Sequence, residues 1–160
     1  MKAFMDKDFM LQSPTAQHLY HDYAAGMPIC DYHCHIPPRE IYENRRFDNI
    51  AQVWLGGRNP DGSYFGDHYK WRVMRSNGVP EEYITGDKPD RERFQKFAEA
   101  LPMAIGNPMY HWTNLELHVF FGYDGVLNGD TAEEVWNLCN DKLQHDPKLT
   151  VRGLIEQSNV

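Results

Sequence analysis

One short stretch between prolines limits the fold of this chain more than any other feature. Residues 28–33, PICDYH, begin at Pro28 and run toward the Pro37–Pro38 pair, so they are too few for a helix and best fit a short strand. The remaining sequence offers no clear second strand. A lone strand leaves its backbone N–H and C=O groups without partners. We therefore expect either a second, hidden strand or a sheet that lies elsewhere.

The rest of the chain carries the start and stop signals of helices. Ser13–Pro14 and Asn107–Pro108 each place a capping side chain before a proline at the first helical position, and Gly26 and Gly122 supply stops. Residues 56–66, GGRNPDGSYFG, predict a loop or a pair of turns. The fold class is mostly α, with seven to eight helices and one or two short strands. The expected helices lie within residues 14–25, 38–46, 48–55, 68–77, 90–101, 107–122, 130–145 and from 146 onward, with a helical turn at 80–85.

Length and charge limit the class of protein. The chain has 160 residues, enough for one domain that buries roughly two thirds of its unfolded surface. Its net charge of −7 argues against a nucleic-acid partner, because phosphate neutralisation needs clustered Lys and Arg, and against a membrane-surface role. Cys30, Cys34 and Cys139 are odd in number and lack CxxC spacing. They favour reduced thiols and a cytoplasmic location.

His33 and His35 are the first candidates for chemistry. Residues i and i+2 of a strand share a face, so the two imidazoles lie side by side with Cys34 turned away, and together they could chelate one divalent ion. The spacing alone favours a polar strand-to-loop turn instead, because two ligands do not make a site. A zinc site that adds Cys30 and Cys34 is a further alternative, although its spacing matches no structural zinc pattern.

A second chemically dense run follows the predicted loop. From spacing alone, residues 67–78, DHYKWRVMRSNG, fit an amphipathic helix with solvated charges and i,i+4 pairs better than a catalytic site. A helix would divide the run into two sides, with Asp67, Lys70 and Trp71 on one and His68, Arg72 and Arg75 on the other.

Four stretches taken together resemble the uronate isomerase (glucuronate isomerase) family, a divergent branch of the amidohydrolase superfamily. They are FMDKDFMLQSPTAQHLYHDYA, PICDYHCHIPPREI, DHYKWRVMRSNGV and AIGNPMYHWTNLEL, in that order. The resemblance runs from about Phe4 to Val160, although residues 56–66 look longer than in some relatives. It implies the N-terminal part of a distorted (β/α)8 TIM-like barrel with a helical insertion. Residues 1–38 would then be an N-terminal helix plus barrel strand one, and residues 39–160 the insertion, with the rest of the barrel absent from this chain.

The resemblance also implies an activity and its residues. Family members interconvert D-glucuronate with D-fructuronate and D-galacturonate with D-tagaturonate. Tyr69 matches the active-site tyrosine and could relay a proton, and His68 could orient substrate or Tyr69. His33 and His35 would hold a divalent metal ion, for which zinc is the first candidate. The family takes further ligands from later strands, so we expect this chain to be inactive alone.

The resemblance also bears on the partners of this chain, and two other functions stay open. A hexuronate sugar is the expected ligand, and a homo-oligomer is an option because an unpaired strand needs something to cover its edges. One alternative is a metal-dependent hydrolase of the same superfamily, since many members share the HxH pattern at strand one. Another is a non-catalytic helical assembly module in which the histidine pair is a vestige.

Overall fold

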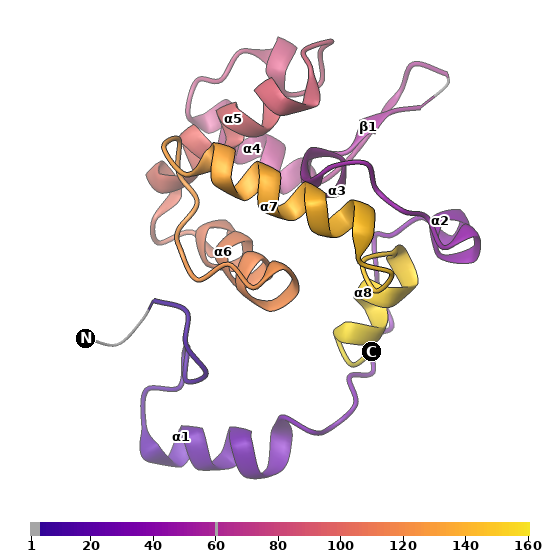
Figure 1. Cartoon of the computed structure of the whole chain (residues 1–160). Coiled ribbons are helices and arrows are strands. Elements are labelled where there is room, and N and C mark those ends of the chain that lie inside the picture. The colour runs from indigo at the N-terminus through magenta and orange to yellow at the C-terminus, as the bar shows by residue number, and fades with distance from the viewer. Residues whose placement is uncertain (1–3, 60) are drawn as a thin grey trace.

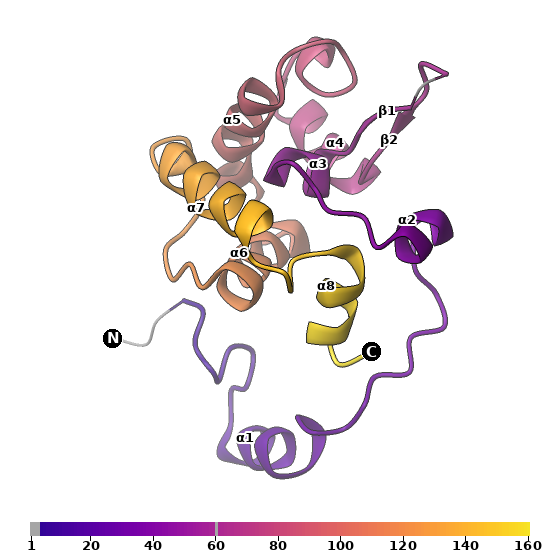
Figure 2. The same ribbon diagram turned by 45° about the vertical axis from the view of Figure 1, so that its right-hand side comes forward.

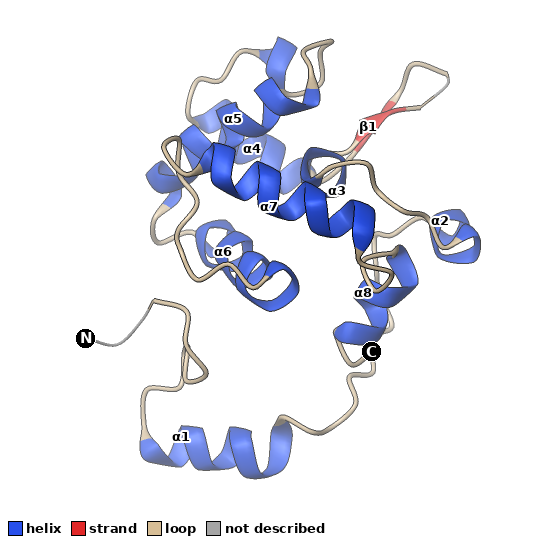
Figure 3. Cartoon of the chain, viewed as in Figure 1, coloured by secondary structure: helices blue, strands red, loops and turns tan. Residues whose placement is uncertain are grey.

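A computed structural model describes residues 4–59 and 61–160, which are mainly helical with one small hairpin (Figure 1). The predicted predominance of helices is confirmed, and Figure 3 shows how little of the chain is strand. No helix in the described part of the chain combines the length and apolar character needed to cross a membrane. The α-helices are α1 (Pro14–Leu19), α2 (Pro38–Glu43), α3 (Ile50–Leu55), α4 (His68–Ser76), α5 (Asp90–Ala100), α6 (Pro108–Phe121), α7 (Ala132–His145) and α8 (Val151–Gln157). A π-helical turn at Tyr20–Ala24 continues α1, and 3-10 turns form at Glu81–Tyr83 and Leu101–Ala104.

Capping side chains begin α1 and α6 where the sequence places them. Ser13 Oγ accepts a hydrogen bond from the Ala16 N–H at 3.1 Å, and Asn107 Oδ1 accepts one from the Met109 N–H at 2.9 Å. Gly122 ends α6 in the left-handed conformation, with φ of 62°, which glycine adopts without steric cost. These local signals fix the start of α1 and both bounds of α6 before any packing is considered.

The last helix begins later than the Asp146–Pro147 pair predicts. Thr150 precedes α8, and its Oγ1 accepts a hydrogen bond from the Gly153 N–H at 3.3 Å. The carboxylate of Asp146 instead accepts the Lys148 N–H at 2.8 Å within a turn. Both segments carry a valid capping residue, and only the second one starts a helix.

The strand predicted at residues 28–33 does not form. This segment runs without regular structure between α1 and α2. The Ile29 N–H donates to the Asn159 carbonyl at 2.8 Å, and Asn159 Nδ2 donates to the Met27 carbonyl at 2.8 Å. Within the described residues no neighbouring strand lies beside it to complete a ladder, so the prediction was wrong for this chain.

The two strands that form lie inside the predicted loop. β1 (Gly57–Arg58) pairs antiparallel with β2 (Tyr64–Phe65), with Gly57 opposite Phe65 and Arg58 opposite Tyr64. Pro60 lies outside the described residues. The turn-rich composition of residues 56–66 therefore marks a short hairpin that projects from the helices (Figure 2).

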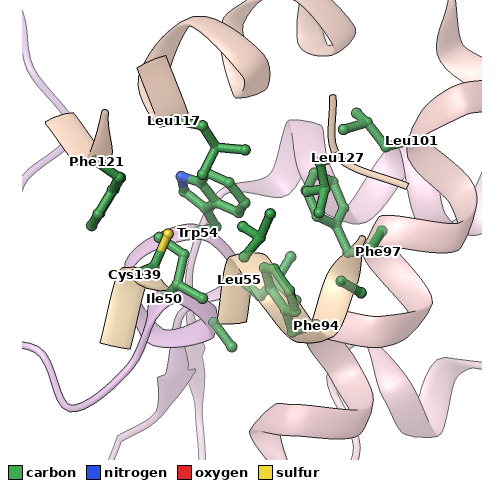
Figure 4. Packing of buried hydrophobic residues seen from close by; sticks show 14 of the residues in the cluster. Ile50, Trp54, Leu55, Phe94, Phe97, Leu101, Leu117, Phe121, Leu127 and Cys139 are labelled. Carbon is green, nitrogen blue, oxygen red and sulfur yellow. The ribbon is translucent and has the colours of Figure 1, made fainter. Parts of the chain in front are cut away.

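The hydrophobic core lies among α3 to α7. The Trp54 ring stacks on the Phe94 ring, with centroids 6.1 Å apart, and meets the Phe97 ring edge-on at 5.8 Å. Burial of such side chains is the main favourable term in folding. Figure 4 shows these residues together with Ile50, Leu55, Leu101, Leu117, Phe121, Leu127 and Cys139.

The N-terminal arm, residues 4–37, contributes little to this core. α1 and its π-helical turn contain no buried residue and lie apart from the other helices in both views (Figures 1 and 2). Near its start, the Phe4 ring meets Tyr110 of α6 at 5.6 Å, and the Phe9 ring meets His111 at 5.9 Å. The arm is thus attached near its two ends and exposed between them.

Candidate functional site

The histidine pair lies within the exposed segment between α1 and α2. The Nε2 atoms of His33 and His35 are 2.9 Å apart, and both residues are exposed. The Asp31 carboxylate accepts the His33 N–H at 3.0 Å and fixes the local turn. Cys34 Sγ reaches the Ile36 carbonyl at 3.9 Å instead of joining the histidines. The two imidazoles therefore converge, although the strand on which the i, i+2 argument rests does not form.

The fold brings the second motif to the same place. The ring of His35 stacks on that of His68, with centroids 6.5 Å apart and planes at 20°. The His68 ring in turn lies 4.3 Å from the Tyr69 ring. Tyr69 is 52% exposed, so its phenol remains accessible at the start of α4. Three histidines and a tyrosine, distant in sequence, thus form one continuous group.

A pocket of about 430 Å³ opens beside this group. His35, His68 and Tyr69 form one part of its lining, and Asp67, Glu40 and Gln52 add oxygens. Its lining contains no lysine or arginine among the described residues. The sequence reasoning missed the apolar wall, because helical periodicity shows which side chains turn inward but not which element they meet. That wall consists of Ile36, Pro37, Phe47, Val53, Phe65, Val151 and Leu154.

Close packing places α4 against the end of α3. A Cβ on Gly66 would lie 2.4 Å from the Leu55 carbonyl oxygen and 2.7 Å from Trp71 Cζ2, so only glycine fits there. Trp71 Nε1 donates a hydrogen bond to the same carbonyl at 3.0 Å. The backbone immediately before His68 is therefore held close to α3 and cannot shift without breaking this contact.

Asp67 caps the N-terminus of α4, and the side chain of Lys70, three residues later, is buried. The Asp67 Oδ1 atom accepts the Tyr69 N–H at 2.8 Å, while Oδ2 accepts a hydrogen bond from Lys70 Nζ at 3.2 Å. Lys70 also lies 3.8 Å from a carboxylate oxygen of Glu116 on α6. The expectation of solvated charges along this helix is wrong for Lys70, which is only 5% exposed.

The side chains at the site supply few of the ligands that a metal ion needs. Two converging imidazole nitrogens fit a divalent ion such as zinc, because neutral imidazole is a common ligand for it. Among the described residues, no group of three or more His, Cys, Asp or Glu side chains could hold an ion together. The alternative zinc site does not form either, since Cys30 and Cys34 are free and exposed. The histidine pair is at most part of a ligand set.

Comparisons with known proteins give one consistent result. A family model described as glucuronate isomerase matches residues 1–160. The chain is 70% identical to a uronate isomerase of Lachnospira eligens and 60% identical to one of Lachnoclostridium phytofermentans, over all of its own length and 32% of theirs. The crystal structure of a uronate isomerase from Thermotoga maritima superposes with a TM-score of 0.85 at 33% identity, covering 99% of this chain and 32% of that one. The chain therefore spans about a third of the length of the relatives that it matches.

Proposed function

The chain belongs to the glucuronate isomerase family, and we propose that the whole protein interconverts the aldose and ketose forms of a hexuronate. The observation that carries this proposal is the meeting of His35, the partner of His33, with His68 and Tyr69 at one pocket. The proposed substrate pairs are D-glucuronate with D-fructuronate and D-galacturonate with D-tagaturonate. The fold of this chain would be the first part of a (β/α)8 barrel, with residues 39–160 inserted after strand one.

The residues at the pocket suit the chemistry. Aldose–ketose interconversion moves a proton between C1 and C2 of the sugar and requires a partner for the oxygen that becomes charged. The accessible Tyr69 phenol is proposed to relay the proton, and the adjacent His68 ring to orient the phenol or the substrate. A divalent metal ion, with zinc as the first candidate, would be held by His33 and His35 and would polarise the sugar oxygen.

The substrate carboxylate requires cations that this pocket lacks. No lysine or arginine lines it among the described residues, and the nearby Lys70 is already paired with two carboxylates. The guanidinium of Arg72 lies over the Tyr69 ring, 5.6 Å from its centroid, and does not line the pocket. We therefore propose that the anionic group of the hexuronate is bound by residues from the other two thirds of the protein.

Tyr69→Phe in the whole protein tests the proposal. The variant removes the phenol and keeps the ring, so we expect turnover of D-glucuronate to fall by about a hundredfold or more, the usual contribution of a positioned proton-transfer group. Tyr42→Phe is the matched control, because Tyr42 is 81% exposed and lies outside the pocket. Equal turnover in the two variants would contradict the role of Tyr69.

Substrate assays of the whole protein separate the isomerase from the hydrolase alternative. A whole protein that cleaves amides or esters and leaves hexuronates unchanged would favour that reading over the isomerase. Metal dependence is tested by His33→Ala, which should lower both bound metal and turnover. The assembly-module alternative requires turnover to be absent in the wild type.

Partners and location remain part of the proposal. A hexuronate is the proposed ligand, and neither a nucleic acid nor a membrane is a proposed partner. A homo-oligomer would help to cover the exposed arm. The cytoplasm is the proposed compartment, because two free thiols, Cys30 and Cys34, are exposed and would be prone to oxidation outside the cell.

A further inference from the structure

We propose that Lys70 is a positioning residue for His68 and Tyr69, acting through Asp67. This inference rests on the proposed isomerase function. The Lys70 side chain does not itself line the pocket. Its burial is unusual for a lysine. The Lys70 side chain is 6% exposed, whereas lysines are rarely buried unless they are paired.

The ammonium group is held from three directions. Its Nζ atom donates to Asp67 Oδ2 at 3.2 Å and lies 3.8 Å from Glu116 Oε1. It also lies 5.7 Å from the centroid of the Trp54 ring, within the range of a cation–π contact. A buried charge requires such partners, so the three elements that supply them are fixed relative to one another.

Asp67 carries this restraint to the site. One of its oxygens accepts the Tyr69 N–H at 2.8 Å and the other binds Lys70, so the carboxylate cannot rotate without losing a bond. His68 and Tyr69 directly follow Asp67 in the first turn of α4. Lys70 therefore sets the orientation of the turn that presents both rings to the pocket. The contact of Lys70 with Glu116 connects the same turn to α6.

Lys70→Met separates positioning from a purely structural role. Methionine fills a similar volume without charge. Removing one partner of an ion pair is costly when the remaining charge stays buried. The carboxylates left behind can be solvated, because Asp67 and Glu116 side chains are 30% and 34% exposed. We expect the melting temperature of the whole protein to be unchanged. We expect kcat for D-glucuronate to fall about tenfold or more, since roughly an ångström of misplacement can cost a hundredfold, while KM changes little.

Lys96→Met is the matched control. Lys96 forms an i,i+3 pair with Glu99 at 2.7 Å on α5, as Lys70 does with Asp67, but its side chain is 38% exposed and lies away from the pocket. This variant should keep wild-type kcat. Equal kcat in Lys70→Met and Lys96→Met, with the wild type active, would overturn the positioning role and leave the proposed function standing.

A double-mutant cycle tests whether Lys70 acts through Asp67. Asp67→Asn keeps an effective helix cap but removes the charge, so it should lower kcat in the same direction as Lys70→Met. If the two residues work as one unit, the double variant loses no more than the worse single variant. Losses that multiply would show that Asp67 and Lys70 act independently, which overturns the proposal.

Glu116→Gln keeps the test decisive if Lys70→Met does not fold. Glu116 does not line the pocket, so it can change kcat only through Lys70 and the packing of α6. We expect kcat to fall several-fold relative to Glu99→Gln, the control on α5. Equal kcat in these two variants would overturn the proposal. A wild-type protein that turns over no hexuronate would overturn it together with the proposed function.

Discussion

At the scale of single residues, environment separates side chains that look equivalent in the sequence. Of the three cysteines, Cys30 and Cys34 are exposed and Cys139 is buried in the core (Figure 4). Lys70 and Lys96 both follow an i,i+3 pattern with an acid, yet only Lys70 is buried. Sequence spacing indicates which groups can pair, and tertiary packing decides whether water reaches the pair.

The thiols should therefore differ in reactivity. Burial raises the pKa of the Cys139 thiol to about 12, with a small opposing effect from Lys142, so it stays protonated at neutral pH. In the folded chain at about pH 8, we expect a thiol reagent such as Ellman's to modify Cys30 and Cys34 quickly. Cys139 should react only after denaturation.

The control is a variant with Cys30→Ser and Cys34→Ser. It should show no rapid modification when folded and one thiol when unfolded, measured by absorbance. Rapid modification of this variant in native buffer would contradict the burial of Cys139.

At the scale of elements, the sequence predicted helices better than strands. Caps and glycine stops are local, so α1 begins at its cap and α6 both begins and ends where those signals lie. A strand depends on a partner, and residues 28–33 have none among the described residues. The same limit applies to the site. His33 and His35 converge without the strand on which the spacing argument rested, and the stacking of His35 on His68 depends on where the segment before α2 lies against α4.

The junction after α4 should contribute a pH-dependent stability. The Arg75 guanidinium, hydrogen-bonded to Glu81, and then the Thr85 hydroxyl lower the pKa of the Glu81 carboxyl to about 2. A lowered folded-state pKa adds stability that is fully present above the unfolded value, near 4.5, and is lost as pH falls toward 2. Because both side chains are about half exposed, solvent screening limits the effect to about 0.2–1 kcal/mol.

Urea unfolding of Glu81→Gln measures this effect. We expect the variant to be less stable than the wild type at about pH 6 and the difference to shrink by about pH 3. Glu82→Gln is the control, since it removes the neighbouring acid, whose contact with Lys88 is 3.8 Å long. A difference that grows as the pH falls would contradict the assigned sign.

At the scale of the whole molecule, the chain consists of a packed helical core and an arm attached near its ends. The core residues belong to α3 to α7 and their connections, while α1 buries none of its side chains. The exposed arm carries Leu19, Tyr23, Met27, Ile29 and Tyr32, of which Tyr32 is 97% exposed. Apolar residues at this density suggest a surface that the remaining part of the whole protein covers.

Limited proteolysis should reveal this division. Chymotrypsin cleaves after aromatic residues in exposed, irregular segments, so in the 160-residue chain we expect the first cut after Tyr32, leaving the helical core resistant. Mass spectrometry of the first products identifies the bond. Tyr32→Ala should slow this cut, and a first cut among residues 50–151 would contradict the division into arm and core.

The same bond in the whole protein tests what covers the arm. If residues 28–33 become barrel strand one in the whole protein, as we propose, neighbouring strands pair with their backbone and exclude the protease. We then expect cleavage after Tyr32 to be at least about tenfold slower in the whole protein, because the segment must open before it is cut. If the cleavage rate is the same at two concentrations of the whole protein, the protection comes from the same chain. If the rate falls as the protein concentration rises, the protection comes from a second copy. Cleavage as fast as in the 160-residue chain would mean that the arm stays uncovered and that no barrel forms around the histidine pair.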